Sequence, residues 1–298
     1  MADLGRLLTA MVTPFDEQGE VDYQQARKLA RALIESGSDG LVISGTTGES
    51  PTLSKEEKLR LFAEVKSEVG KGVVAGTGSY NTRESIELTR EAEKEGADAI
   101  LLVVPYYNKP TQEGLYRHFK AIAESTSLPC ILYNVPGRTG TNMAAETVVR
   151  LSEIDNIVGV KEASGNFEQI ARIIQDTHGD FLVLSGNDSD TLPILALGGY
   201  GVISVASHLV GNQIQQMMES FLNKRIAEAG EAHRRLLPLI DALFVVANPV
   251  PVKYALNHIG FPVGKPRLPL VEPDEKTKLI IETTLRVYSI DIPPAYLN

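Results

Sequence analysis

Short apolar runs recur along roughly the first 210 residues of the chain, as expected for a succession of strands. Most of the runs are continuous rather than alternating, and several are rich in valine and isoleucine, which is typical of strands buried on both faces of a parallel sheet. Successive runs are spaced by roughly 20 to 32 residues, the length of a strand followed by a helix. The eight predicted strands are Leu7–Val12, Gly40–Ile43, Val73–Ala75, Ala99–Val104, Cys130–Tyr133, Ile157–Val160, Phe181–Leu184 and Val202–Val205.

Between most of these runs lies a stretch with the periodicity of an amphipathic helix. One of them begins with Ser-Lys-Glu-Glu, a capping box in which Ser54 is the N-cap and Glu57 stands three residues later. The predicted helices are Gln24–Ser36, Ser54–Val69, Arg83–Lys94, Gln112–Ser125, Ala144–Ile154 and Asn166–Thr177.

Eight such units favour an α/β fold, a closed (β/α)₈ TIM barrel. A doubly wound open sheet fits less well, because its usual Gly-rich phosphate turn is replaced by Thr-Pro-Phe at 13–15. The repeats stop near residue 210, and from Gln213 onward the chain reads as helices with breaks at Asn248–Pro251 and Phe261–Pro269. We therefore expect a catalytic barrel over residues 1–223 and a C-terminal helical domain over residues 224–298.

The composition excludes several classes of partner. The chain has 298 residues, a net charge of −9 and an isoelectric point near 5.2, whereas binding to nucleic acid or to an anionic membrane needs a basic face. The single cysteine, Cys130, allows no intrachain disulfide and fits a reducing compartment. We see neither a signal peptide nor an apolar run of about 18 residues, so we expect a cytoplasmic protein.

Barrels of this type place their active sites at the strand ends. Among the residues there, Lys161 stands out because it is a charged residue where a buried strand is expected. It directly follows a buried run, and burial of an ammonium group is costly unless its pKa falls or a carboxylate pairs with it. A neutral amine in a pocket is what imine formation with a ketone requires. The alternative is a structural lysine that pairs with Glu162 or Glu49.

Two further strand ends carry candidate chemistry. Tyr133 can transfer protons, although it can also be a rim aromatic residue. Thr46 and Thr47 stand in a glycine-flanked turn, where N–H and hydroxyl groups can hold a small carboxylate, but the same sequence also suits a plain tight turn. Arg138, in a Pro-Gly loop, can bind a carboxylate bidentately or can simply lie on the surface.

Other chemistries find less support in the sequence. The histidines show no spacing typical of metal ligands, so no metal site is expected. A phosphate-binding GxxxxGK[ST] motif and a GxSxG nucleophile motif are both absent from the sequence. The segment Ser-Gly-Asn-Asp at 185–188 is interpreted as a pocket wall.

Six motifs are distributed along the chain: GTTGES at 45–50, PYYNKP at 105–110, YNVPGRTG at 133–140, VKEASG at 160–165, GGYGVISV at 198–205 and NPVPVK at 248–253. Taken together, these motifs resemble the dihydrodipicolinate synthase family of pyruvate-dependent class I aldolases, the group that includes N-acetylneuraminate lyase. The similarity spans the whole chain.

The resemblance implies that Lys161 forms an imine with pyruvate and that no other cofactor is needed. Tyr133 would then transfer protons in a relay with Thr46 and Tyr107, and Thr47 would hold the pyruvate carboxylate. By the same similarity, Tyr107 enters the site of a neighbouring subunit. A dimer would thus be the smallest active unit, and a homotetramer built from tight dimers is expected.

The second substrate implied by the resemblance is L-aspartate 4-semialdehyde, whose carboxylate would bind Arg138. Gly186 and Ile203 would line the pocket, the latter through its backbone carbonyl. The product would feed diaminopimelate and lysine biosynthesis. A related aldolase that acts on another aldehyde or a sugar acid would share Lys161 and Tyr133, but Arg138 and the GTTGE turn favour the semialdehyde. A non-catalytic binding protein would be expected to lack the lysine or the tyrosine relay.

Family members that are sensitive to feedback bind lysine at a subunit interface near the Tyr-Tyr loop. Glu84 and Tyr106 fit such a site, whereas Lys55 and Lys58 stand where sensitive members often have histidines. Two added cations repel an incoming ammonium group, so we expect weak or no inhibition by lysine. Alternatively, both lysines point into solvent. The matching positions are Ser50, Pro51, Lys55, Lys58, Tyr80, Glu84 and Tyr106.

Overall fold

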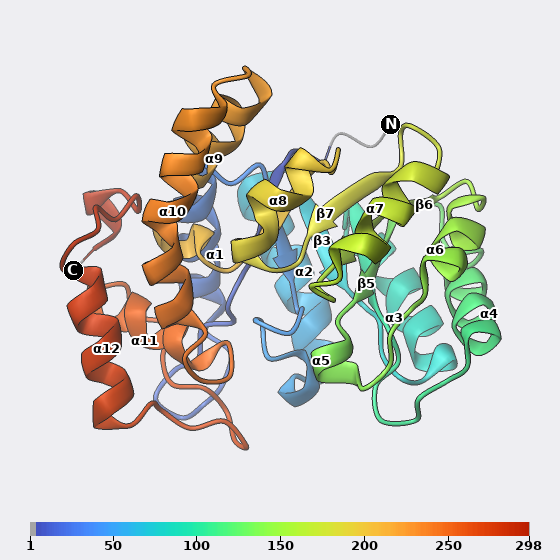
Figure 1. Cartoon of the computed structure of the whole chain (residues 1–298). Helices are drawn as coiled ribbons and strands as arrows, with labels where there is room; N and C mark the ends of the chain where they lie inside the picture. The colour runs from blue at the N-terminus through green and yellow to red at the C-terminus, as the bar shows by residue number, and fades with distance from the viewer. Residues whose placement is uncertain (1–3, 298) are drawn as a thin grey trace.

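Eight parallel strands close into a barrel in the computed structural model, which describes residues 4–297 (Figure 1). Each strand pairs with the next along the chain, and the last pairs with the first, so the predicted (β/α)₈ barrel is confirmed. The strands are β1 (Leu7–Ala10), β2 (Gly40–Ile43), β3 (Val73–Gly76), β4 (Ala99–Val103), β5 (Cys130–Asn134), β6 (Ile157–Glu162), β7 (Leu182–Ser185) and β8 (Gly201–Ser204).

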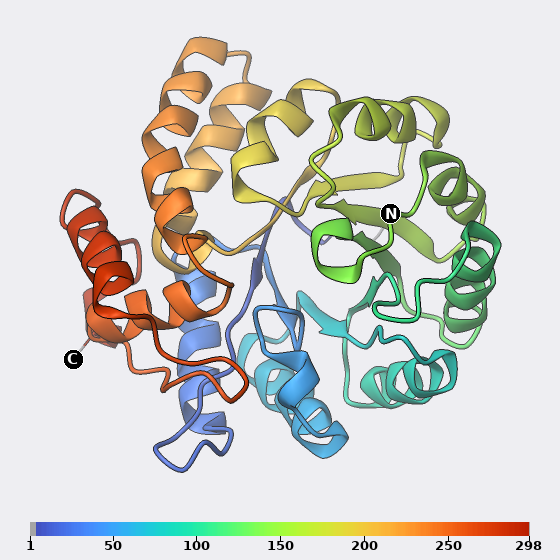
Figure 2. The same cartoon turned by 60° about the horizontal axis from the view of Figure 1, so that its bottom comes forward.

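Helices surround the barrel, and most begin at a side chain that caps the first turn (Figure 2). The capping box predicted at Ser54 and Glu57 is present, with both reciprocal hydrogen bonds formed. The helices that the sequence pattern predicted are α1 (Tyr23–Glu35), α2 (Lys55–Val69), α3 (Thr82–Lys94), α4 (Gln112–Ala123), α6 (Ala145–Ser152) and α7 (Phe167–Asp176).

The sequence pattern missed two short helices, α5 (Pro136–Thr139) and α8 (Thr191–Ala196), and the beginning of α9 (Ser207–Leu222). α5 has four residues and α8 has six, too few for a helical period to be visible. The first turn of α9 is buried on all sides, so it lacks the polar face that marks an amphipathic helix.

Three more helices, α10 (Ile226–Leu243), α11 (Val250–His258) and α12 (Glu275–Leu285), lie together on one side of the barrel (Figure 2). Their buried apolar residues belong to the same core cluster as those between the strands and the barrel helices. α11 begins inside the predicted break, because a proline in a first helical turn costs no hydrogen bond. The boundary at residues 223/224 stays a prediction, and residues 1–3 and 298 of the two predicted domains lie outside the described residues.

The direction of each side chain on a strand determines what can meet inside the barrel. A second apolar cluster fills the barrel interior and includes Tyr133 and Leu184. Lys161 on β6 stands in register between these two residues, so its side chain also points inward. Glu162, the next residue, points outward to the helices. None of the helices among residues 4–297 is long and apolar enough to cross a membrane.

Candidate active site

Lys161 lies inside the barrel beside Tyr133. Its side chain is buried, with 6% of the residue surface exposed, and its Nζ atom lies 4.2 Å from the centre of the Tyr133 ring. Tyr133 is equally buried, and the two residues are direct neighbours in the pairing of β5 with β6. The strand pairing therefore brings the predicted imine-forming amine and the predicted proton donor together.

Within residues 4–297, the Lys161 amine forms neither a hydrogen bond nor an ion pair, although both carboxylates considered as partners are present. Glu162 accepts hydrogen bonds from Asn134 and Gln169 on the outer face of the barrel, at 3.0 and 3.1 Å. Glu49 pairs with Lys253 at 2.9 Å. The interpretation of Lys161 as a structural lysine paired with either glutamate is therefore wrong.

Gly186, just after β7, packs closely against the Lys161 side chain. A β-carbon at this position would lie 3.2 Å from Cε of Lys161 and 2.7 Å from Cβ of Ala163, closer than side chains pack. Ile203 is buried on β8 and stands in register with Leu8. Gly186 therefore packs against the lysine, but neither it nor Ile203 is among the residues that line the cavity beside Tyr133, so their pocket-lining role stays a prediction.

Asp188 is a buried carboxyl group that the sequence reasoning had treated only as part of a pocket wall. It accepts a hydrogen bond from the Ser204 hydroxyl and others from the backbone N–H groups of Val205 and Ala206, at 2.9 and 3.2 Å. Burial raises the pKa of Asp188, while these bonds and the charge of Lys161 act in the opposite direction. The sequence signal that could have identified Asp188 is its position as a carboxyl group just after a barrel strand.

The turn after β2 carries Thr46 and Thr47. Thr47 is buried, and its hydroxyl accepts a hydrogen bond from Nδ2 of Asn248 at 2.9 Å. The turn ends at Glu49, whose backbone is left-handed with φ of 56° and whose side chain is held by Lys253. A plain surface turn would not need these buried partners, which fix the turn to the C-terminal segment.

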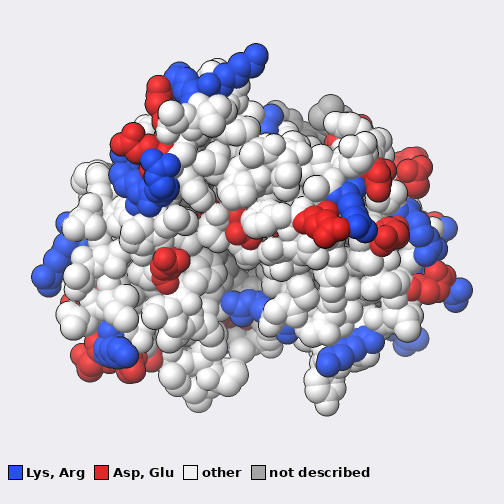
Figure 3. Space-filling view, in the orientation of Figure 1, with Lys and Arg blue, Asp and Glu red and all other residues white. Residues whose placement is uncertain are grey.

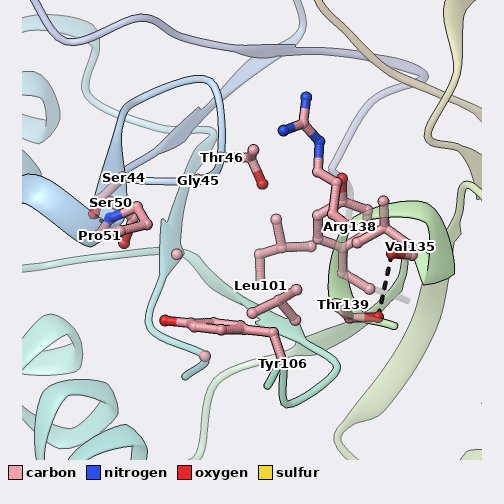
Figure 4. Close-up of a pocket in the computed structure, with 14 residues that line it drawn as sticks. Ser44, Gly45, Thr46, Ser50, Pro51, Leu101, Tyr106, Val135, Arg138 and Thr139 are labelled. Carbon is pink, nitrogen blue, oxygen red and sulfur yellow. Dashed lines mark hydrogen bonds between the residues drawn. The ribbon is translucent and has the colours of Figure 1, made fainter. Parts of the chain in front are cut away.

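Arg138 lies on α5 and is exposed in the single chain, at one side of a cavity of about 170 Å³ that Thr46 and Tyr133 also line. Its Nη2 group donates to the backbone carbonyl of Asn248 at 3.4 Å. In Figure 4, Thr46 and Arg138 lie on one side of this cavity and Tyr106 lies across from them. Figure 3 shows basic side-chain atoms at a depression between the barrel and the C-terminal helices.

Tyr107 is the one predicted catalytic residue that a single chain does not bring to the site. It is 92% exposed and does not line the cavity that contains Tyr133. Its backbone has a φ of 73°, a left-handed conformation that is uncommon for a residue other than glycine. The neighbouring Tyr106 does line the cavity.

A second cavity adjoins the first, and all the residues predicted for an effector site line it. Lys55 Nζ is 2.7 Å from a carboxylate oxygen of Glu91, whereas burial lowers the pKa of Lys58 and nearby Glu84 opposes that shift. The rings of Tyr80 and Tyr106 meet edge to face, with centroids 5.1 Å apart. The predicted residues in this lining are Ser50, Pro51, Lys55, Lys58, Tyr80, Glu84 and Tyr106.

A (β/α)₈ barrel with an unpaired buried lysine beside a tyrosine at its strand ends defines a lyase of the Schiff-base-forming aldolase class. The family model of the dihydrodipicolinate synthetase family matches residues 3–287, and the chain belongs to this family.

Individual relatives agree with this assignment over nearly their full length. The chain is 64% identical over 295 residues to 4-hydroxy-tetrahydrodipicolinate synthase of Dehalococcoides mccartyi strain CBDB1, covering 98% of this chain and 99% of the relative. A crystal structure of dihydrodipicolinate synthase from Bacillus anthracis is 49% identical with a TM-score of 0.95, covering 97% and 99% of the two chains. One from Cyanidioschyzon merolae with lysine bound is 50% identical with a TM-score of 0.94, covering 96% and 98%.

Proposed function

We propose that this chain condenses pyruvate with L-aspartate 4-semialdehyde to form 4-hydroxy-tetrahydrodipicolinate, a step of diaminopimelate and lysine biosynthesis. The observation that carries the proposal is the Lys161 amine, which is buried beside Tyr133 and unpaired among the described residues. A buried amine without a carboxylate partner is the group that can add to a ketone.

The first half of the proposed reaction binds pyruvate covalently. Nζ of Lys161 attacks the ketone carbon, and the resulting carbinolamine loses its hydroxyl as water when Tyr133 supplies a proton. Loss of a methyl proton from the iminium then gives the enamine. Thr46 lies on the same cavity and can pass protons between Tyr133 and solvent. Thr47, in the fixed turn, would hold the pyruvate carboxylate.

The second half forms the carbon–carbon bond and releases the enzyme. The enamine carbon attacks the aldehyde of the semialdehyde, and a proton passes to the new alkoxide. The substrate amine then adds to the iminium carbon and displaces Lys161, which closes the ring. Arg138 at the side of the cavity suits the semialdehyde carboxylate, since a guanidinium group binds carboxylates bidentately. The lysine imine takes the place of a cofactor.

We infer that the complete site needs a second copy of the chain, which supplies Tyr107 to the proton relay. The exposure of Tyr107 and its left-handed backbone support this arrangement. We expect a homotetramer built from tight dimers. Mixed oligomers of inactive Tyr107→Phe and inactive Lys161→Ala subunits should regain part of the activity, because some sites then contain both groups. No recovery in verified mixed oligomers would contradict the shared site.

We also infer that the second cavity binds L-lysine only weakly. Lys55 and Lys58 bring two cations to its lining, opposed by Glu84 and Glu87 and by the Glu91 carboxylate that pairs with Lys55. Lys55 and Lys58 would repel the ammonium group of an incoming lysine and so offset the attraction of these carboxylates.

Trapping with borohydride tests the proposed mechanism directly. Incubation with pyruvate and borohydride should inactivate the enzyme irreversibly, and mass mapping should find the adduct on Lys161. Lys253, the other deeply buried lysine of the described residues, serves as an internal control and should stay unmodified. Trapping at another lysine, or the absence of any trapped adduct, would contradict the proposed mechanism. Trapping without turnover of the semialdehyde would point to a related aldolase with a different aldehyde.

A further inference from the structure

One residue outside the barrel makes hydrogen bonds to both proposed carboxylate anchors. Asn248 precedes α11 and is 6% exposed. Its side-chain Nδ2 donates to the Thr47 hydroxyl at 2.9 Å, and its backbone carbonyl accepts from the Arg138 guanidinium at 3.4 Å. No other residue between positions 4 and 297 hydrogen-bonds to both of them.

Thr47 and Arg138 belong to separate elements of the barrel, the turn after β2 and the short helix α5. α5 has only four residues, and the Arg138 side chain is exposed, so the barrel alone holds it loosely. The single bond from Arg138 to Asn248 therefore ties its guanidinium to the C-terminal part of the chain.

Asn248 can act as a fixed reference because the helix that follows it is anchored. Lys253 on α11 donates to the carbonyl of Thr13 at 3.0 Å and to the carboxylate of Glu49 at 2.9 Å. Glu49 lies two residues after Thr47 and also accepts from the backbone N–H of Arg267 at 2.8 Å. The C-terminal segment thus holds the Thr46–Thr47 turn at two points.

We propose that Asn248 is a positioning residue that holds Thr47 with its side chain and Arg138 with its backbone carbonyl, so that the affinity for pyruvate depends on the asparagine side chain. This inference rests on the proposed function, in which the two residues hold the two carboxylates. A covalent reaction between two bound substrates requires both anchors within a fraction of an ångström of the productive geometry.

Asn248→Ala tests the proposal because it removes the side-chain bond to Thr47 but keeps the backbone carbonyl that accepts from Arg138. We expect the pyruvate concentration for half-maximal borohydride trapping to rise about three- to tenfold, the range of one neutral hydrogen bond, while the KM for the semialdehyde stays within twofold of the wild-type value. Trapping at saturating pyruvate should still label Lys161.

Asn156→Ala is the matched control. Its side-chain amide donates to the carbonyls of Ala123, Thr126 and Leu128, at 2.9, 3.2 and 3.2 Å, around the start of β6, the end of the strand opposite Lys161. This variant loses more hydrogen bonds than Asn248→Ala, so its Tm should fall at least as far. Both substrate constants should stay within twofold of the wild-type values.

The outcomes separate the proposal from its alternatives. A pyruvate requirement within twofold of wild type in Asn248→Ala, an equal rise in the KM for the semialdehyde, or an equal change in Asn156→Ala would each overturn it. Should Asn248→Ala fail to fold, Asn248→Asp keeps the shape and adds a negative charge beside Thr47, so half-maximal trapping should need at least tenfold more pyruvate. An unchanged requirement would also overturn the proposal. A wild-type enzyme without trapping would instead refute the proposed function.

Discussion

Lys161 and Lys253 are both buried lysines, with 6% and 1% of their surfaces exposed, but their surroundings are opposite. The Lys253 ammonium contacts three oxygens at 2.9 to 3.0 Å, one of them on Glu49, and lies 4.1 Å from the centre of the Phe15 ring. Lys161 has one comparable neighbour, the ring of Tyr133. Burial alone therefore does not identify a reactive lysine. A reactive lysine is identified by a buried amine that lacks hydrogen-bond and ion-pair partners.

The difference follows from the cost of burying a charge. Removing an ammonium group from water costs several kcal/mol, which is offset only by a close counter-charge and further hydrogen bonds. At Lys253, burial lowers the pKa to about 8, and the neighbouring Glu49 opposes this shift. All three N–H donors of the Lys253 ammonium group are used, and two of them join α11 to loops of the barrel. Lys161 lacks such partners among residues 4–297, so its amine is available to a substrate.

The largest expected effect comes from removing the unpaired amine. Lys161→Ala should lower kcat by at least about a thousandfold, because covalent catalysis is lost. The free energy of unfolding should stay the same or rise, since no ion pair is broken. Initial rates and denaturant unfolding measure the two quantities. If Lys161→Ala kept activity within tenfold of wild type, Lys161 would not be the reactive lysine, and reactivity would not distinguish it from Lys253.

The second lysine should show the reverse pattern. Lys253→Met should lower the free energy of unfolding by about 3–5 kcal/mol, because it leaves Glu49 buried without a counter-charge. The double variant Lys253→Met/Glu49→Gln should recover part of this loss in denaturant unfolding. The folded fraction of each variant should still form the pyruvate adduct on Lys161. A loss below about 1 kcal/mol would mean that the pair is not structural.

Arg138 extends the comparison to a cation whose side chain makes one hydrogen bond within residues 4–297. Arg138→Ala should lower kcat/KM for the semialdehyde roughly 30- to 1,000-fold, which corresponds to a loss of about 2–4 kcal/mol in binding free energy, while pyruvate trapping survives. Arg150→Ala is a suitable control, because Arg150 is an exposed arginine that pairs with Glu113 away from the cavity. If semialdehyde kinetics barely change in Arg138→Ala, Arg138 is a surface residue.

Lys58 lies between the two extremes, since it is partly buried in the second cavity and has no ion pair within residues 4–297. Initial rates in millimolar L-lysine should fall little. Lys58→His should bind lysine more tightly by on the order of 1 kcal/mol, about fivefold, because it removes a full charge near an ammonium group. Strong inhibition of the wild-type enzyme would show that both cations point away from the bound effector.

The sequence by itself determined the barrel and its most informative residue. Strands of a parallel barrel are buried on both faces, so they leave continuous apolar runs such as Cys130–Tyr133 that local pattern can detect. A lysine that follows such a run stands out for the same reason. The capping box at Ser54 is equally local, because its two partners are three residues apart.

Only the tertiary structure decided which charges meet. Glu49 and Glu162 were both candidate partners of Lys161 in the sequence, yet one pairs with Lys253, 204 residues away, and the other faces outward. The bond from Asn248 to Thr47 joins residues 201 positions apart. Contacts of this range depend on how the strands close and where the C-terminal helices pack, so they leave no periodic trace in the sequence around either partner.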